Sequence, residues 1–228
     1  MMSMKKLMIA AVCGGLALSA AGVAFSHGSG DDGADIKLTV TQPTEPVEAS
    51  DGLAAWDRIY GVVSHPRCSN CHVDESNVPM WSGPSYGETR PHGMNINGGL
   101  SRIGFESLPC QTCHTQSTDF DSAPHAPPRT GHAWMLAPVE FAWFGKQSGE
   151  ICEQMRDPAR NGGRDGAGLV EHIIHDAEIK AFITWGFNPG GDREPAPGSM
   201  QEHLDDMVLW TAAGMPCPTD FAATEDQQ

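Results

Sequence analysis

Two copies of a Cys-x-x-Cys-His motif constrain this chain more than any other feature. Two thiols three positions apart can add across the two vinyl groups of one porphyrin, and the imidazole that follows then lies beneath the iron as its proximal ligand. Each motif therefore predicts one covalently attached haem c. The residues predicted to hold the two haems are Cys68, Cys71 and His72, and Cys110, Cys113 and His114.

Two Cys-x-x-Cys pairs in one chain are also compatible with a structural zinc site. The histidine that directly follows each pair favours haem. The N-terminus favours it too, because c-type haem is attached to exported chains.

The N-terminus has the pattern of a secretory signal peptide. Lys5 and Lys6 precede an apolar run over residues 7–25, and small residues flank Phe25 near the expected cleavage point. We expect residues 1–26 to be removed, residues 27–51 to form a flexible tether, and the mature protein to be periplasmic. Retention of the apolar run as a membrane anchor is the alternative, but no stop-transfer segment supports it.

The acidic composition limits the choice of partners. A formal net charge of −15 argues against nucleic acid. The charge suits docking to a basic patch on a redox partner, although solubility is the simpler explanation.

With 26 glycines and 17 prolines, the composition favours turns and loops over long regular elements. We expect a mostly α, loop-rich, di-haem cytochrome c-like fold in which short helices wrap around the two covalent haems. This domain should span residues 52–218, with a helical C-terminal part over 147–218 and an acidic tail over 219–228.

The apolar spacing and the capping residues predict individual helices. The first covers residues 53–63 behind Asp51, and Ser148 and Asp176 are candidate caps for later ones. The last helix is the best marked, with a capping box of Ser199 and Glu202 and a stop at Gly214. The remaining expected helical segments are 148–155, 169–175 and 177–185.

Each iron needs a sixth ligand or keeps an open position. His92 and His125 lie in Pro-bounded segments that follow the two motifs, and such rigid loops can hold an imidazole over a haem face. Our preferred hypothesis is bis-His ligation, with His92 on one haem and His125 or His132 on the other. Hydrogen bonding of these histidines to a propionate or a carbonyl is the alternative, and Met94 and Met135 are the leading sulfur candidates.

Other polar residues have weaker assignments. His172 and His175 share one side of a short expected helix; they could bind a metal, bridge a propionate or pack, and we favour the last two. Arg102, Arg129 and Arg164 are candidate propionate partners.

Cys152 and Cys217 lie outside both motifs in a chain with an export signal. A disulfide between them is the economical interpretation, and a reactive dithiol is the alternative. The disulfide would join the helix that begins near Ser148 to the C-terminal tail and would stabilise the fold by a few kcal/mol.

Several blocks of the sequence, over about residues 56–218, resemble a family of bacterial exported di-haem proteins labelled isoquinoline 1-oxidoreductase subunit. The resemblance implies an electron-accepting cytochrome partner of a molybdenum hydroxylase that oxidises N-heterocycles or aldehydes. The matching blocks are 65–72, 91–95, 108–114, 125–132, 157–163, 169–172, 175–176 and 214–218.

The leading hypothesis for function is one-electron transfer between a periplasmic dehydrogenase and a respiratory acceptor, with no catalytic residue in this chain. Two alternatives remain, and both require an iron with an open position. One is a di-haem peroxidase-like enzyme, and the other is a haem-based sensor.

Overall fold

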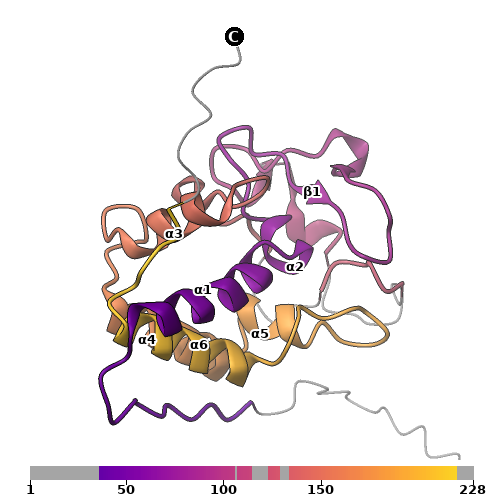
Figure 1. Cartoon of the computed structure of the whole chain (residues 1–228). Coiled ribbons are helices and arrows are strands. Elements are labelled where there is room, and N and C mark those ends of the chain that lie inside the picture. The colour runs from indigo at the N-terminus through magenta and orange to yellow at the C-terminus, as the bar shows by residue number, and fades with distance from the viewer. Residues whose placement is uncertain (1–35, 106, 115–122, 129–133, 220–228) are drawn as a thin grey trace, which may run out of the picture. The chain divides into compact units, whose positions relative to one another are not determined.

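The computed structural model describes residues 36–105, 107–114, 123–128 and 134–219 (Figure 1). The predicted signal peptide, the first part of the predicted tether, His132, Arg129 and most of the predicted acidic tail lie outside the described residues.

Helices dominate the regular structure of the described ranges, which confirms the expectation of a mostly helical, loop-rich fold. The α-helices are α1 (Ala49–Val63), α2 (Pro66–Ser69), α3 (Ser148–Arg156), α4 (Gly166–Ile179), α5 (Phe182–Phe187) and α6 (Met200–Ala212). Short 3-10 turns are η1 (Gly93–Asn95), η2 (Cys110–Thr112) and η3 (Val139–Phe141). Within these ranges, no helix is long and apolar enough to cross a membrane.

Two antiparallel pairs of very short strands lie in the segment between α2 and η3. They are β1 (Met80–Trp81) with β2 (Arg90–Pro91), and β3 (Gly104–Phe105) with β4 (Leu108–Pro109). In the first pair Trp81 lies opposite Arg90. The second pair leads directly into Cys110, so the second Cys-x-x-Cys-His motif begins at the end of a hairpin.

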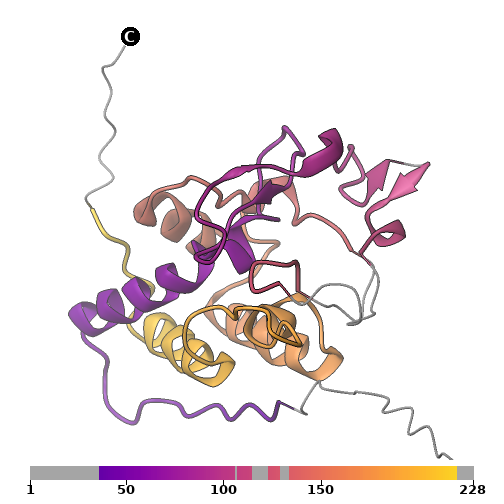
Figure 2. The ribbon, with the colours of Figure 1, turned by 90° about the vertical axis from the view of Figure 1, so that its right-hand side faces the viewer.

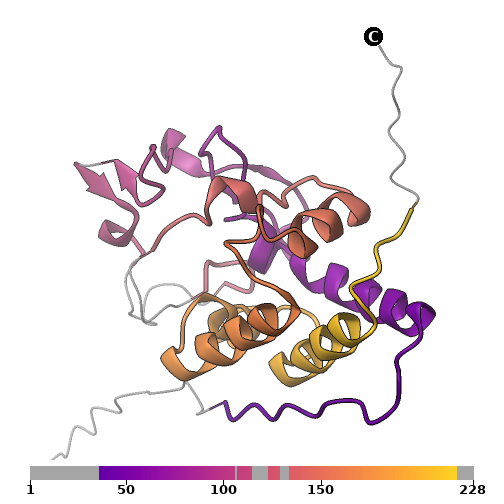
Figure 3. The same ribbon diagram turned by 90° about the vertical axis from the view of Figure 1, so that its left-hand side faces the viewer.

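The main apolar core is formed by α1, α3, α4 and α6. At its centre the fully buried rings of Trp56 and Trp210 lie 5.0 Å apart, and Leu204 and Met207 of α6 are buried beside them. Figures 2 and 3 show α4 and α6 grouped below α1, with the strand-bearing segment on the other side of α1.

The predicted cap residues of α1, α3 and α6 can be compared with those in the structure. Ser199 and Glu202 form the predicted capping box of α6. Helix α1 begins at Ala49, earlier than predicted, and places Asp51 inside its first turn. Ser148 does not cap α3; its Oγ accepts a hydrogen bond from the indole N–H of Trp56 at 2.8 Å, and Gln147 occupies the N-cap position.

Asp176 caps a helix, but in a way that its position did not predict. Helix α4 begins earlier than expected because Asp165 accepts from the backbone N–H of Gly168, and it continues through Asp176 to Ile179. The buried Asp176 carboxylate then accepts from the backbone N–H groups of Ile183 and Thr184, in the first turn of α5. One side chain in the last turns of α4 therefore anchors the start of α5.

The described part of the predicted tether contacts the helical core. Ile36 and Leu38 pack against the apolar cluster. Thr39 donates its backbone N–H to the side-chain oxygen of Gln201 and accepts from its Nε2, each at 2.9 Å. These contacts run the segment along α6.

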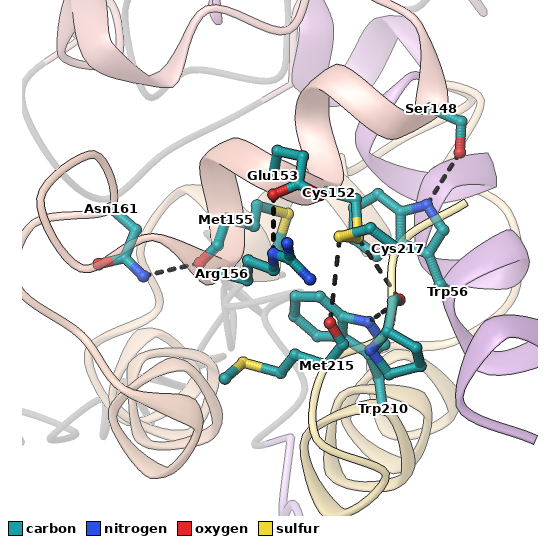
Figure 4. The surroundings of a disulfide bond; sticks show 11 residues. Trp56, Ser148, Cys152, Glu153, Met155, Arg156, Asn161, Trp210, Met215 and Cys217 are labelled. Atoms are coloured by element: carbon teal, nitrogen blue, oxygen red, sulfur yellow. Dashed lines mark hydrogen bonds and ion pairs between the residues drawn. A yellow bond between two sulfur atoms is a disulfide. The ribbon is translucent and has the colours of Figure 1, made fainter. Parts of the chain in front are cut away.

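Cys152 and Cys217 form the predicted disulfide, with Cα atoms 5.6 Å apart and a sequence separation of 65. It joins α3 to the segment that follows α6 (Figure 4). The Trp210 indole N–H donates to the carbonyl of Pro216 at 2.9 Å and so orders the approach to Cys217. The disulfide thus closes the helical core at one end.

Candidate functional site

The segment that carries both Cys-x-x-Cys-His motifs is organised by polar contacts rather than by the main core. The described residues from 66 to 141 contribute none of the buried side chains that form the main apolar cluster. Most of this segment is irregular, as the lack of periodicity predicted. Its arrangement therefore depends on the individual contacts described below.

The first motif begins in α2. Pro66 occupies the first helical position, where a missing N–H costs nothing, and His65 caps the turn by accepting from the N–H of Arg67. Backbone hydrogen bonds from Cys71 to Cys68 and from His72 to Ser69 continue the turn through the motif. Both thiols and the imidazole are thus presented by one compact turn.

His72 is held in a single orientation by two contacts. Its Nδ1 lies 2.9 Å from the carbonyl oxygen of Phe141, and its ring stacks on Trp143 with centroids 3.6 Å apart and planes within 5°. Burial lowers the pKa of His72 to about 4, so the ring is neutral. Because a carbonyl only accepts, the proton resides on Nδ1 and the lone pair is on Nε2, which is the arrangement of a metal-binding histidine.

Arg102 connects the first motif to the chain around residue 137. Its guanidinium donates to the carbonyls of Val73, Asp74 and Ala137 and to the side-chain oxygen of Asn77. Burial lowers its pKa from the ordinary value. We predicted Arg102 as a propionate partner, but its described contacts are with the protein backbone and an amide.

The second motif begins at η2, where the N–H of Cys110 donates to the carbonyl of Ile103. The ring of His114 stacks on Trp134 with centroids 4.1 Å apart and planes 25° apart. Each motif histidine therefore rests on a tryptophan that lies further along the chain.

The two motifs lie next to each other. The pKa of the Cys71 thiol is raised to about 11, first by burial and then by the nearby thiol of Cys110. Burial also raises the pKa of Cys68 to about 12. None of the four motif cysteines is in a disulfide.

His92 and His125, two of the predicted sixth ligands, flank the same indole. Each ring centroid lies 6.3 Å from that of Trp81. His92 also lies 5.9 Å from His114, and its Nδ1 is 2.9 Å from the carbonyl of Gly93. Because a carbonyl only accepts, His92 Nδ1 donates this hydrogen bond and its Nε2 is left without a part in it.

The loop of His125 is attached to the first motif by Arg67. The Arg67 guanidinium donates to the carbonyls of Pro124, Ala126 and Glu194. Gly83 packs against the same loop, since a Cβ placed there would lie 3.5 Å from the Cβ of His125 and 2.6 Å from a Glu194 carboxylate oxygen. A side chain at Gly83 would therefore require the Glu194 carboxylate to move.

The strand that carries Trp81 is also attached to the first motif. Asn70 accepts from the hydroxyl of Ser82 at 2.7 Å, donates to the Ser82 carbonyl at 3.0 Å, and accepts at its own carbonyl from the N–H of Met80. Asn70, between the two cysteines of the first motif, therefore attaches the strand of Trp81 to that motif.

The other candidates are dispersed. Met94 is 84% exposed in η1 and Met135 is 43% exposed. His172 lies close enough to His72 to lower its pKa slightly, His175 lies 3.7 Å from Glu178, and Arg164 donates to the carbonyl of Asn161. His132 and Arg129 are outside the described residues.

Sequence reasoning missed the residues that hold the ligands in place. Trp81, Trp143 and Arg67 have no distinctive spacing, and their contacts join segments far apart in the chain. The signal that could have identified them is their occurrence among the cysteines, histidines and prolines between residues 66 and 143.

Comparisons of this chain with protein families, with curated proteins and with solved structures find no match. Over the described ranges, no group of three or more His, Cys, Asp or Glu side chains is arranged to hold a single metal ion.

Proposed function

We propose that this protein is a periplasmic di-haem c-type cytochrome that transfers one electron at a time. The observation that carries the proposal is the juxtaposition of two complete Cys-x-x-Cys-His motifs, with Cys71 beside Cys110 and His92 beside His114. Haem supplies an iron that is reversibly oxidised and reduced by one electron.

The described residues fit haem c at both motifs. At the first, the hydrogen bond from His72 to Phe141 directs Nε2 away from the backbone, and the stack on Trp143 holds the plane of the ring. At the second, the His114 ring stacks on Trp134 with the two planes 25° apart. A proximal ligand needs this kind of fixed tautomer and orientation.

The distance between His92 and His114 supports His92 as the sixth ligand at the second motif. An imidazole that lies close to His114 is a residue that could hold the same iron. The observed separation is 5.9 Å. We assign His125 to the iron of the first motif, because Arg67 ties its loop to the turn that carries Cys68.

Exposed apolar side chains beside the second motif also support haem there. Leu100 is 99% exposed, and Ile103, Phe105 and Leu108 of the hairpin that leads into Cys110 are partly exposed. Covering such surface contributes about 25 cal/mol per Å². A porphyrin attached to Cys110 and Cys113 offers two apolar faces within reach of this hairpin.

The placement of the motifs suits transfer between two centres within one molecule. The Cys110 thiol lies near enough to Cys71 to raise its pKa, after the larger effect of burial, so groups attached to the two thiols would be neighbours. An electron received at one centre could then pass to the other while the protein stays bound to its partner. A donor such as a molybdenum hydroxylase and a respiratory acceptor are the partners we propose, recognised through the acidic surface.

The experiment is a redox titration of protein matured with haem, combined with visible and near-infrared spectra with and without carbon monoxide. We expect two one-electron waves, low-spin spectra without the methionine-to-iron charge-transfer band, and no reaction of the ferrous protein with carbon monoxide. A high-spin component that binds carbon monoxide in the unaltered protein would overturn the carrier and favour an enzyme or a sensor.

A further inference from the structure

Trp81 of β1 has an indole N–H that lacks a hydrogen-bond partner among the described residues. This N–H group is buried. A buried donor left without a partner is costly, so such groups in native proteins usually have one. Because an indole N–H can only donate, its partner must be an acceptor.

Arg90 adds a positive charge at the same place. It lies opposite Trp81 in the β1–β2 pair, and its guanidinium carbon is 5.3 Å from the Trp81 ring centroid and 5.2 Å from that of Tyr86. Arg90 is exposed, and within the described ranges no carboxylate forms an ion pair with it. An N–H donor and a guanidinium on neighbouring strands are a combination suited to a carboxylate.

The surroundings of Trp81 indicate which carboxylate. The indole is flanked by His92 and His125, and His92 in turn lies 5.9 Å from His114 of the second motif. Asn70 of the first motif anchors the strand of Trp81 through Ser82. Trp81 therefore lies near residues that contact both motifs.

We propose that the Trp81 indole N–H and the Arg90 guanidinium bind a propionate carboxylate of one of the haems, an inference that rests on the proposed function. The Tyr86 ring, 5.2 Å from the guanidinium carbon, would keep Arg90 beside Trp81. Trp81 and Arg90 are positioning residues, and they also tune the iron: a cation beside the carboxylate offsets its negative charge and favours the ferrous form.

The test measures the two reduction potentials of haem-loaded Arg90→Gln, Arg90→Lys and Trp81→Phe. Removing this positive charge should raise the ferric to ferrous ratio of one haem about tenfold at its wild-type midpoint. Arg90→Lys should keep most of the wild-type potential, and Trp81→Phe should shift the same haem in the same direction by less. Arg156→Gln, an equal charge change on α3, should shift neither potential.

A second readout is the resonance Raman spectrum, in which the propionate-bending band should move in Trp81→Phe and Arg90→Gln but not in Arg156→Gln. Unchanged potentials and bands in variants that carry two haems would overturn the propionate assignment and leave the proposed function standing. A wild-type potential that responds to added acetate, with a loss of the response in Trp81→Phe, would assign the pair to a free carboxylate instead. Failure to attach haem at all, measured first as the pyridine haemochrome, would overturn both proposals together.

Discussion

Trp143 stacks on His72 with ring centroids 3.6 Å apart and planes within 5°. Trp143 is fixed in turn by a 2.8 Å hydrogen bond from its indole N–H to Gln154 of α3, and its backbone N–H donates to the carbonyl of His72. The plane of the predicted proximal imidazole is therefore linked to the helical core.

Replacing Trp143 by Leu should let the His72 ring rotate. We expect altered g values for one of the two low-spin ferric haems by electron paramagnetic resonance, and a loss of about 2 kcal/mol in the free energy of unfolding. Trp143→Phe keeps a stacking ring and should leave the g values close to wild type. Identical spectra for Trp143→Leu and wild type would show that the stack does not orient the ligand.

His92→Ala should open one iron and leave the other six-coordinate. The expected result is a high-spin component and binding of about one carbon monoxide per ferrous protein, measured by optical titration. Met94→Leu is the matched control in the same loop, and because Met94 is exposed it should behave like wild type. If Met94→Leu bound carbon monoxide and His92→Ala did not, the ligand would be the sulfur.

Arg67→Gln should loosen the loop of His125, because the guanidinium donates to backbone carbonyls at Pro124 and Ala126 on that loop and at Glu194. We expect a loss of about 2–3 kcal/mol in the free energy of unfolding and a change in the spectrum of one haem. The exposed Arg156 provides a control, since its contact is a surface pair with Glu153. A spectrum unaffected by Arg67→Gln would contradict the assignment of His125 to the first motif.

The Cys152–Cys217 disulfide closes a loop with a sequence separation of 65. The chain-entropy relation gives it about 4 kcal/mol, lost in the double variant Cys152→Ser, Cys217→Ser. Denaturant unfolding should show this loss while the haem spectra stay unchanged, because the bond lies in the helical core. An unchanged midpoint would mean that the bond does not constrain the unfolded chain.

His203 should make stability depend on pH. It is 8% exposed in α6, near Arg58, Glu202 and Asp206, and burial lowers its pKa to about 4 from an ordinary 6.5. In the unfolded chain His203 binds a proton below about pH 6.5, whereas in the folded protein it binds one only below about pH 4. Stability is thus present in full above pH 6.5 and falls as the pH drops towards 4, by about 2 kcal/mol between pH 7 and pH 5.

Urea unfolding of wild type and His203→Gln at pH 7 and pH 5 checks this prediction. The difference between the two pH values should be smaller in the variant by about 2 kcal/mol. An equal pH dependence in both proteins would place the titration elsewhere.

Local signals in the sequence predicted the parts of the fold that local physics decides. The capping box at Ser199 and the stop at Gly214 predicted α6, and the two cysteines outside both the motifs and the predicted signal peptide predicted the disulfide. Asp176 shows the limit: its capping preference was visible, but the helix it caps begins at Phe182 because α4 continues beyond it.

The candidate site shows the same division. The Cys-x-x-Cys-His motifs and His92 were visible as patterns, whereas the contacts of Arg67, Trp143 and Trp81 join residues 11 to 127 positions apart. Such contacts depend on how the irregular segment folds back on itself, which no periodicity encodes.

The most direct test of the central claim is the number of haems attached to each chain. It is measured by pyridine haemochrome and intact mass after co-expression with a c-type haem maturation system. The proteins compared are the wild type and two double variants, one with Cys68→Ala and Cys71→Ala and the other with Cys110→Ala and Cys113→Ala. We expect two haems in the wild type and one in each double variant. A wild-type chain that carries no covalent haem, or that binds zinc through these cysteines, would contradict the central claim.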